Sequence, residues 1–260
     1  MKNYRRNFLK DAGLISIAAA VSPTIILNAT PLDSGVKLAS EAKLGNGFVF
    51  LFQGDSITDG NRGRNTDPNH IMGHGYAFSI ASRVGVDHPE KHLSFYNRGV
   101  SGNKVSDLAI RWQKDCLDLK PDVLSILVGI NDISYAVKSG DKLLMLRFKE
   151  TLQSLLSQAK AANPDVLVVL CLPFILPLGK VVDKLDLYEL GIAQLHADIQ
   201  SVALEYNSLV VDFQQVMIHA CKKAPADYWM WDGIHPTVAG HELLAREWIK
   251  VVGKKLSFLR

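Results

Sequence analysis

Two short segments of the chain combine the residue types that nucleophilic catalysis requires. "GDSITDG" places Ser56 directly after an apolar run, and "WDGIHP" places Asp232 three residues before His235. A serine hydroxyl is a weak nucleophile and needs a neighbouring base. At this spacing in a loop, the Asp232 carboxylate can reach Nδ1 of His235 while Nε2 faces outward, so the imidazole is a candidate base. Taken alone, Ser56 could equally cap a helix, and Asp232 could belong to a solvated turn.

Two further segments offer hydrogen-bond donors for an oxyanion. In "RGVSGN", Gly99 and Gly102 can present backbone N–H groups with no Cβ in the way. In "GIND", Asn131 carries a side-chain amide that can donate to the same kind of group. Each segment could also be a plain turn, because Gly, Asn and Asp are frequent in turns. Neither is specific by itself.

Five apolar runs rich in β-branched or aromatic residues have the length of strands. They are residues 48–53, 93–97, 123–128, 166–172 and 209–213. Helical patterns lie between them and after the last, at residues 76–86, 104–119, 142–162, 185–206 and 238–254. Thr237 is the expected N-cap of the final helix.

This alternation of strands and helices predicts a three-layer, doubly wound α/β domain. Near-continuous hydrophobicity in the third and fourth strands indicates burial on both faces, as in parallel sheets. In such domains ligands bind beyond the carboxyl ends of the strands. The three polar segments "GDSITDG", "RGVSGN" and "GIND" directly follow the first three strands, and "WDGIHP" precedes the last helix. Four individually weak signals therefore converge on one edge of the sheet.

Together the four segments resemble the SGNH hydrolases, the broad relatives of GDSL esterases and lipases. The blocks of that family occur here in order, as "GDS" (54–56), Gly102 within "RGVSGN", "GIND" (129–132) and "DGIHP" (232–236). The resemblance covers roughly residues 48 to 252. Ile57 stands where the name GDSL has Leu, a change that leaves the chemistry intact.

The resemblance implies a role for each of these residues. Ser56 would be the nucleophile, His235 the general base and then acid, and Asp232 the orienting carboxylate. The oxyanion hole would consist of the Ser56 and Gly102 backbone N–H groups and the Asn131 side chain. The expected reaction is acyl transfer to water through an acyl-serine, with no metal and no organic cofactor. The implied fold is an α/β/α sandwich around a five-stranded parallel, flavodoxin-like sheet.

Three carboxylates are predicted to support this machinery. Asp55 and Asp59 flank the serine and are expected to hold its turn, and Asp132 is expected to hold the loop after the third strand. The "G-x-S-x-G" elbow of α/β-hydrolases is absent from the chain.

Four further side chains are candidates for substrate binding. Arg62 and Arg64 lie in a polar loop after the nucleophile, where they could meet an acidic sugar or pair with a neighbouring Asp. Trp229 and Trp231 precede Asp232 and could stack on sugar rings, although loop-anchoring or core Trp residues are as common.

No long apolar, lid-like segment flanks the motifs, which disfavours long-chain lipid as the substrate. The chain most resembles exported bacterial members of the family, among which removal of acetyl groups from polysaccharides is frequent, and this resemblance favours an esterase that removes O-acetyl groups from carbohydrates. A lysophospholipase or thioesterase, or an acyltransferase, would use the same catalytic residues. A non-catalytic carbohydrate-binding protein on the same scaffold is the alternative from another class.

Residues 1–45 are expected to be an export signal and spacer, and residues 46–260 the catalytic domain. A basic start that includes the twin-arginine-like "RRNFLK" precedes a short apolar run, which predicts a periplasmic or extracellular protein; an amphipathic helix is the alternative. No lipobox cysteine is present, so no stable membrane anchor is expected.

The composition is that of an ordinary globular protein, with 48% hydrophobic and 21% charged residues. A net charge of +3 without a basic stripe does not indicate nucleic-acid binding. Cys116, Cys171 and Cys221 form no metal pattern, and Cys171 lies in an apolar run that suits the core. The expected partner is an ester substrate, small or polymeric; the oligomeric state is not indicated.

Overall fold

Residues 47–140 and 143–260 are described by a computed structural model of the chain. The predicted export signal and spacer lie outside the described residues, and so does the predicted domain boundary after residue 45. Both stay predictions.

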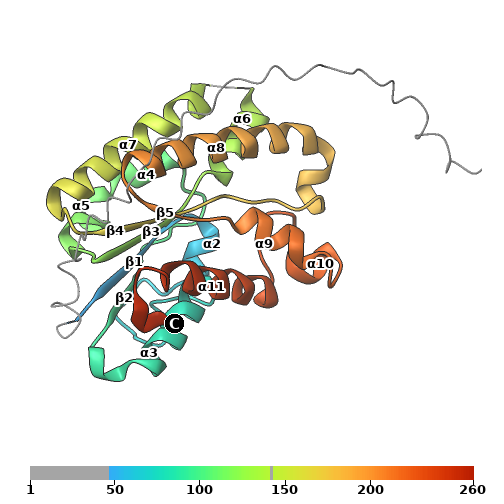
Figure 1. Cartoon of the computed structure of the whole chain (residues 1–260). Coiled ribbons are helices and arrows are strands. Elements are labelled where there is room, and N and C mark those ends of the chain that lie inside the picture. Colours follow the sequence, from blue (N-terminus) through green and yellow to red (C-terminus); the bar gives the residue numbers. More distant parts are fainter. Residues whose placement is uncertain (1–46, 141–142) are drawn as a thin grey trace, which may run out of the picture. The chain divides into compact units, whose positions relative to one another are not determined.

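The five predicted strands form one parallel sheet in the order β2-β1-β3-β4-β5 (Figure 1). They are β1 (Val49–Gly54), β2 (Ser94–Asn97), β3 (Val123–Leu127), β4 (Leu167–Cys171) and β5 (Leu209–Val211). This is the flavodoxin-like strand order, in which the winding reverses between β1 and β3. The ends of these two strands are level, because Gly54 pairs with Leu127. The predicted fold class is confirmed.

Helices cover both faces of the sheet. They are α2 (Ser56–Asp59), α3 (Tyr76–Asp87), α4 (Val105–Ile110), α5 (Trp112–Asp115), α6 (Ile130–Ser139), α7 (Leu143–Ala162), α8 (Leu185–Glu205), α9 (Phe213–Ala220), α10 (Ala226–Trp229) and α11 (Val238–Val252). Short 3₁₀ helices are η1 (Pro89–Lys91), η2 (Leu117–Leu119), η3 (Gly179–Lys184) and η4 (Ser257–Leu259). α3 and α11 pack together on one side, and α4, α7 and α8 lie on the other (Figure 1). The short α2 stands at the carboxyl edge of the strands.

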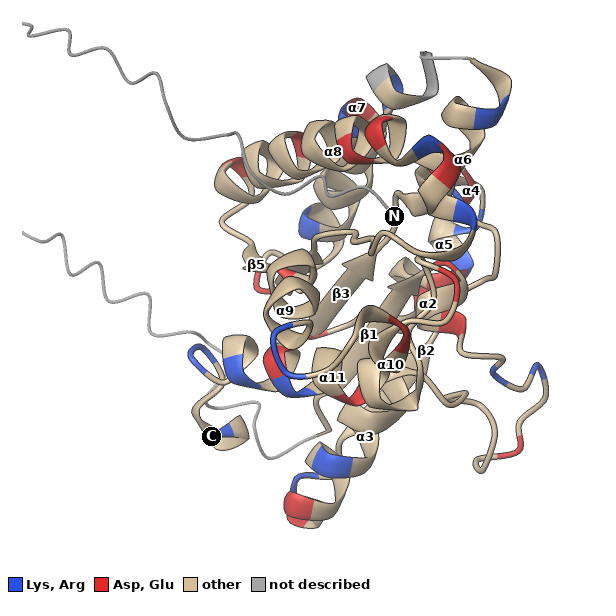
Figure 2. Cartoon of the chain, turned by 90° about the vertical axis from the view of Figure 1, so that its right-hand side faces the viewer, with Lys and Arg blue, Asp and Glu red and all other residues tan. Residues whose placement is uncertain are grey.

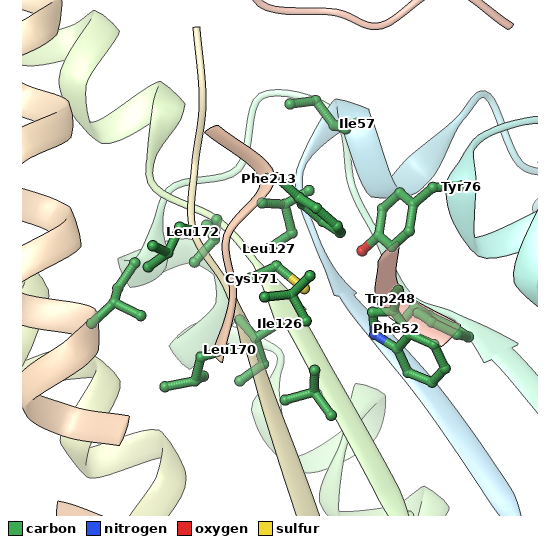
Figure 3. Packing of buried hydrophobic residues seen from close by; sticks show 14 of the residues in the cluster. Phe52, Ile57, Tyr76, Ile126, Leu127, Leu170, Cys171, Leu172, Phe213 and Trp248 are labelled. Carbon is green, nitrogen blue, oxygen red and sulfur yellow. The ribbon is translucent and has the colours of Figure 1, made fainter. Parts of the chain in front are cut away.

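The core is formed by apolar side chains on both faces of the central strands (Figure 3). All five residues of β3 are buried, as the unbroken apolar run predicts. The one hydroxyl among them, on Ser125, accepts a hydrogen bond from the Trp248 indole N–H at 3.0 Å, which satisfies both buried groups. Cys171 is a buried core residue, as predicted, and burial raises the pKa of its thiol to about 12.

Three local predictions were wrong. The helix expected over residues 104–119 is broken at Arg111, whose backbone leaves the helical region at φ −110° and ψ 9°. "GIND" was interpreted as a loop, but Asn131 and Asp132 lie in the first turn of α6. The fifth strand ends at Val211 because the next residue, Asp212, caps α9 by accepting a hydrogen bond from the Gln215 N–H at 2.9 Å.

Acidic and basic residues are mixed on the helices rather than separated by sign (Figure 2). On α11, for example, Glu242 pairs with Arg246 and Glu247 pairs with Lys250. Within the described residues, no helix has the length and apolar character that crossing a membrane demands. The same part of the chain contains no group of three or more His, Cys, Asp or Glu side chains arranged to hold a metal ion.

Candidate active site

The turn after β1 exposes Ser56 at the carboxyl edge of the sheet. A Cβ on Gly54 would lie 2.2 Å from the Leu127 carbonyl oxygen, so only glycine lets β1 and β3 approach this closely where the turn begins. Asp55 then caps α2, with its Oδ1 accepting a hydrogen bond from the Ile57 N–H at 3.0 Å. The N-cap is therefore Asp55 rather than Ser56, which leaves the serine hydroxyl available to another partner.

That partner is His235. Its Nε2 lies 2.8 Å from Ser56 Oγ, and its Nδ1 lies 2.8 Å from Oδ2 of Asp232. Because an ionised carboxylate can only accept hydrogen bonds, Nδ1 carries the proton and Nε2 faces the serine with its lone pair. The three predicted triad residues thus form one hydrogen-bonded chain, in which the imidazole can take the hydroxyl proton as the oxygen attacks a carbonyl.

A short loop between α10 and α11 holds the Asp–His pair. An antiparallel bridge joins Met230 to Pro236 across it. Inside the loop, Oδ1 of Asp232 accepts hydrogen bonds from the backbone N–H groups of Ile234 at 3.0 Å and His235 at 2.7 Å. Burial by itself would raise the pKa of Asp232, but these donors, the His235 ring and the Lys180 ammonium stabilise the carboxylate and hold its pKa well below the usual range.

The predicted oxyanion donors come from three neighbouring segments. Ser56 is the first residue of α2, so its N–H points out of the helix rather than into the ladder of helical hydrogen bonds. A Cβ on Gly102 would meet no atom within 4 Å, which shows open space beside this backbone. Asn131 donates to the Asn103 carbonyl at 3.1 Å through Nδ2. This bond ties its amide to the loop between β2 and α4 (residues 98–104), the Gly102 loop. An amide nitrogen has two hydrogens, so the second can serve an oxyanion.

The supporting carboxylates lie beneath these groups. Asp59 accepts hydrogen bonds from the Ser101 N–H at 3.0 Å and the Arg62 N–H at 3.0 Å, which joins the nucleophile turn to the Gly102 loop. Asp55 is buried, and that burial raises its pKa to about 7. Asp132 is also buried, and it accepts from the Val105 N–H at the start of α4, with 3.3 Å to each carboxylate oxygen.

Three of the four candidate substrate-binding residues, Arg62, Arg64 and Trp229, form contacts within the protein. Arg64 forms an ion pair with Asp59 at 2.7 Å, and Arg62 donates from Nε to the Gly99 carbonyl at 2.9 Å. The Trp229 indole N–H donates to the Ala224 carbonyl at 3.2 Å, which anchors the loop. Trp231 differs, because the residue is 68% exposed and its ring is stacked on the His235 imidazole, with centroids 5.9 Å apart and planes 26° apart. Their roles in substrate binding stay predictions.

Comparison with known proteins identifies the family. Residues 52–243 match the model of the GDSL-like lipase/acylhydrolase family. The chain belongs to the GDSL-like lipase/acylhydrolase family. As a member of that family it is a serine esterase.

Individual relatives of this GDSL-like esterase extend over most of its length. An acetylxylan esterase of Geobacillus stearothermophilus is 31% identical over 223 residues, which cover 81% of this chain and 96% of the relative. The crystal structure of Axe2, an acetylxylan esterase of the same organism, superposes with a TM-score of 0.71 at 32% identity, covering 81% of this chain and 96% of that one. A GDSL-like lipase candidate from Parabacteroides merdae has a TM-score of 0.76 at 37% identity, covering 81% and 97%.

Sequence reasoning missed Arg111, which organises the base of the GDSL-like site. Its guanidinium donates to Gln53 Oε1 at 2.9 Å, to the Arg98 carbonyl at 2.7 Å and to Asn103 Oδ1 at 2.9 Å. Arg111 therefore connects β1, the segment after β2 and Asn103, whose carbonyl accepts the hydrogen bond from Asn131. The available signal was Gln53, a polar residue in an otherwise apolar strand that would need a buried partner. Lys180, beside Asp232, was also missed, and nothing in the sequence pointed to it.

Asp132 supplies a prediction about stability and pH. Burial, and to a smaller extent the Asp55 charge, raise its pKa, while the Val105 hydrogen bond and Lys104 oppose the rise, and together they place the pKa at about 7. The folded protein therefore retains a proton that the unfolded chain has already lost above about pH 4. Because the native state binds more protons between these two values, its free energy of unfolding falls as the pH rises through them.

Asp132→Asn keeps an acceptor for the Val105 N–H and removes this titration. We expect urea unfolding at about pH 5 and about pH 8 to show that the free energy of unfolding falls less in the variant than in wild type. The difference in this change should be on the order of 2 kcal/mol in favour of the variant. Asp118→Asn, which removes an exposed carboxylate on η2, is the control and should show the pH dependence of wild type. An equal effect of Asp132→Asn at both pH values would contradict the prediction.

Proposed function

We propose that this esterase removes O-acetyl groups from carbohydrates, with acetylated xylan fragments as the first candidates. The observation that carries the proposal is the similarity to an acetylxylan esterase, which extends over 81% of this chain and 96% of the relative. Similarity of that extent covers most of the chain rather than a shared motif alone.

The proposed reaction has two halves. Ser56 Oγ attacks the acetyl carbonyl carbon as His235 Nε2 takes the hydroxyl proton, and Asp232 stabilises the resulting imidazolium. The carbonyl oxygen becomes an oxyanion that accepts hydrogen bonds from the Ser56 and Gly102 N–H groups and from Asn131. The bond to the sugar oxygen then breaks, and His235 returns the proton to that oxygen. In the second half, His235 deprotonates a water that attacks the acetyl-serine, which releases acetate and restores the serine.

The position of Trp231 is evidence that the leaving group of the substrate is a sugar. Its exposed indole lies beside His235, the group that would protonate the leaving sugar oxygen. Aromatic side chains with one apolar face accessible can stack on the C–H face of a sugar ring. An exported enzyme would meet such polymers directly, and residues 1–45, which predict an export signal, are outside the described residues.

An acetate-release screen tests the proposal. We expect wild-type protein, but not Ser56→Ala, to release acetate from acetylated xylo-oligosaccharides when these are compared with acetylated pectin, mannan and sialic acids. Cleavage of lysophospholipid without acetate release from any glycan would show a lysophospholipase instead. Appearance of the acetyl group on a second sugar would show an acyltransferase, and sugar binding without ester cleavage would show a binding protein.

A further inference from the structure

Oδ2 of Asp232 has two charged or chargeable partners rather than one. The His235 ring lies 2.8 Å from it through Nδ1, and the Lys180 ammonium lies 2.9 Å from it through Nζ. The second oxygen, Oδ1, is occupied by backbone N–H groups from the same loop. The carboxylate is nearly enclosed, with 11% of its side chain exposed, while the Lys180 side chain is 52% exposed. A lysine from a different segment thus shares the oxygen that orients the base.

The backbone around Lys180 is held against the Asp232 loop. Gly179 precedes it with φ +56°, and a Cβ there would lie 2.7 Å from the Asp232 carbonyl oxygen, so no larger residue fits without displacing the loop. Val181 follows and is fully buried. The Leu176 N–H also donates to the Gly233 carbonyl at 3.1 Å. These contacts fix the segment after β4 on the catalytic loop, and the position of Lys180 follows from them although its ammonium reaches solvent.

We propose that Lys180 is a positioning residue of this esterase: its ammonium orients Oδ2 of Asp232 toward His235 and offsets part of the carboxylate charge, so that His235 stays neutral and able to accept the serine proton at lower pH. The inference rests on the serine-esterase chemistry and not on the identity of the sugar.

The charges around His235 give the direction of the effect. A neighbouring carboxylate favours protonated imidazole, and a cation next to that carboxylate reduces the preference. His241 on α11 also interacts electrostatically with His235, and with His74. Burial, together with the charges of His74 and His235, lowers the pKa of His241 to about 4, so it is neutral in the range where His235 must act. Removing Lys180 should therefore strengthen the preference of the Asp232 carboxylate for a protonated imidazole.

The test is the pH dependence of kcat/KM for p-nitrophenyl acetate in Lys180→Met, Lys180→Arg and Lys184→Met. Lys184 is a matched control, because it ends the same 3₁₀ helix and its Nζ contacts the Val137 carbonyl at 3.4 Å rather than the triad. We expect the acidic limb of Lys180→Met to move upward by about 0.5–1 pH unit, which lowers kcat/KM by about 3–10-fold on that limb. Lys180→Arg and Lys184→Met should follow wild type.

Three results would overturn the proposal: an acidic limb of Lys180→Met that coincides with wild type, an equal shift in Lys184→Met, or a uniform loss of activity at all pH values with the limb unmoved. The last would mean that Lys180 only supports the loop structurally. The rate of covalent labelling by a fluorophosphonate, measured over the same pH range, is a second readout that needs no ester. Neither measurement uses a glycan, so failure of the acetylxylan proposal would leave this test intact.

Discussion

Ser56→Ala is expected to lower kcat/KM for acetyl esters by about 10⁴-fold or more, and to abolish covalent labelling by a fluorophosphonate. The reason is geometric, since Ser56 Oγ lies 2.8 Å from His235 Nε2. Without this oxygen, no acyl-enzyme can form at this position. What remains is the contribution of the oxyanion donors and of substrate binding, which accelerates direct attack by water only modestly.

Two controls separate loss of the nucleophile from loss of structure. Ser101→Ala removes the same atom from an exposed serine in the Gly102 loop and leaves its backbone bond to Asp59 in place, so it should retain activity and labelling. The double variant Ser56→Ala/His235→Ala should be no slower than Ser56→Ala, because residues that act as one unit are not additive. Labelling that persists in Ser56→Ala would show that another residue is the nucleophile.

Asn131→Ala is expected to lower kcat by about 10²–10³-fold with a small effect on KM. The amide is held toward the site by its hydrogen bond to the Asn103 carbonyl, and it sits in the first turn of α6, directly after β3. A donor fixed in this way stabilises the charge that develops on the carbonyl oxygen, and therefore acts in the transition state more than in substrate binding.

Ser134→Ala is the matched control for Asn131→Ala. It lies on the same helix, and its hydroxyl accepts a hydrogen bond from Tyr188 at 3.2 Å rather than contacting the catalytic residues. It should leave kcat unchanged. A large rise in KM for Asn131→Ala with kcat preserved would assign the amide to ground-state binding instead of the oxyanion hole.

Much of the fold follows from local patterns. Strand-length apolar runs separated by helical periodicity predict a parallel α/β sheet, and the observed strands lie within about a residue or two of the predicted ranges. The failures have specific causes. The helix expected over 104–119 breaks at Arg111, the residue whose guanidinium donates to Gln53 on β1 and to the Arg98 carbonyl after β2. Such partners are distant in sequence, so no local pattern contains them.

The order of residue types along the chain was enough to predict which residues meet at the site. In a parallel sheet all carboxyl ends share one edge, so polar segments after successive strands must converge there, and a three-residue spacing lets Asp232 reach His235. The surroundings of these residues became visible in the folded chain alone: Arg64 pairs with Asp59, Trp231 stacks on the His235 ring, and Lys180 lies beside Oδ2 of Asp232. The physical reason is that long side chains take the partners that packing brings within reach, and that packing joins segments which the order of residues along the chain does not relate.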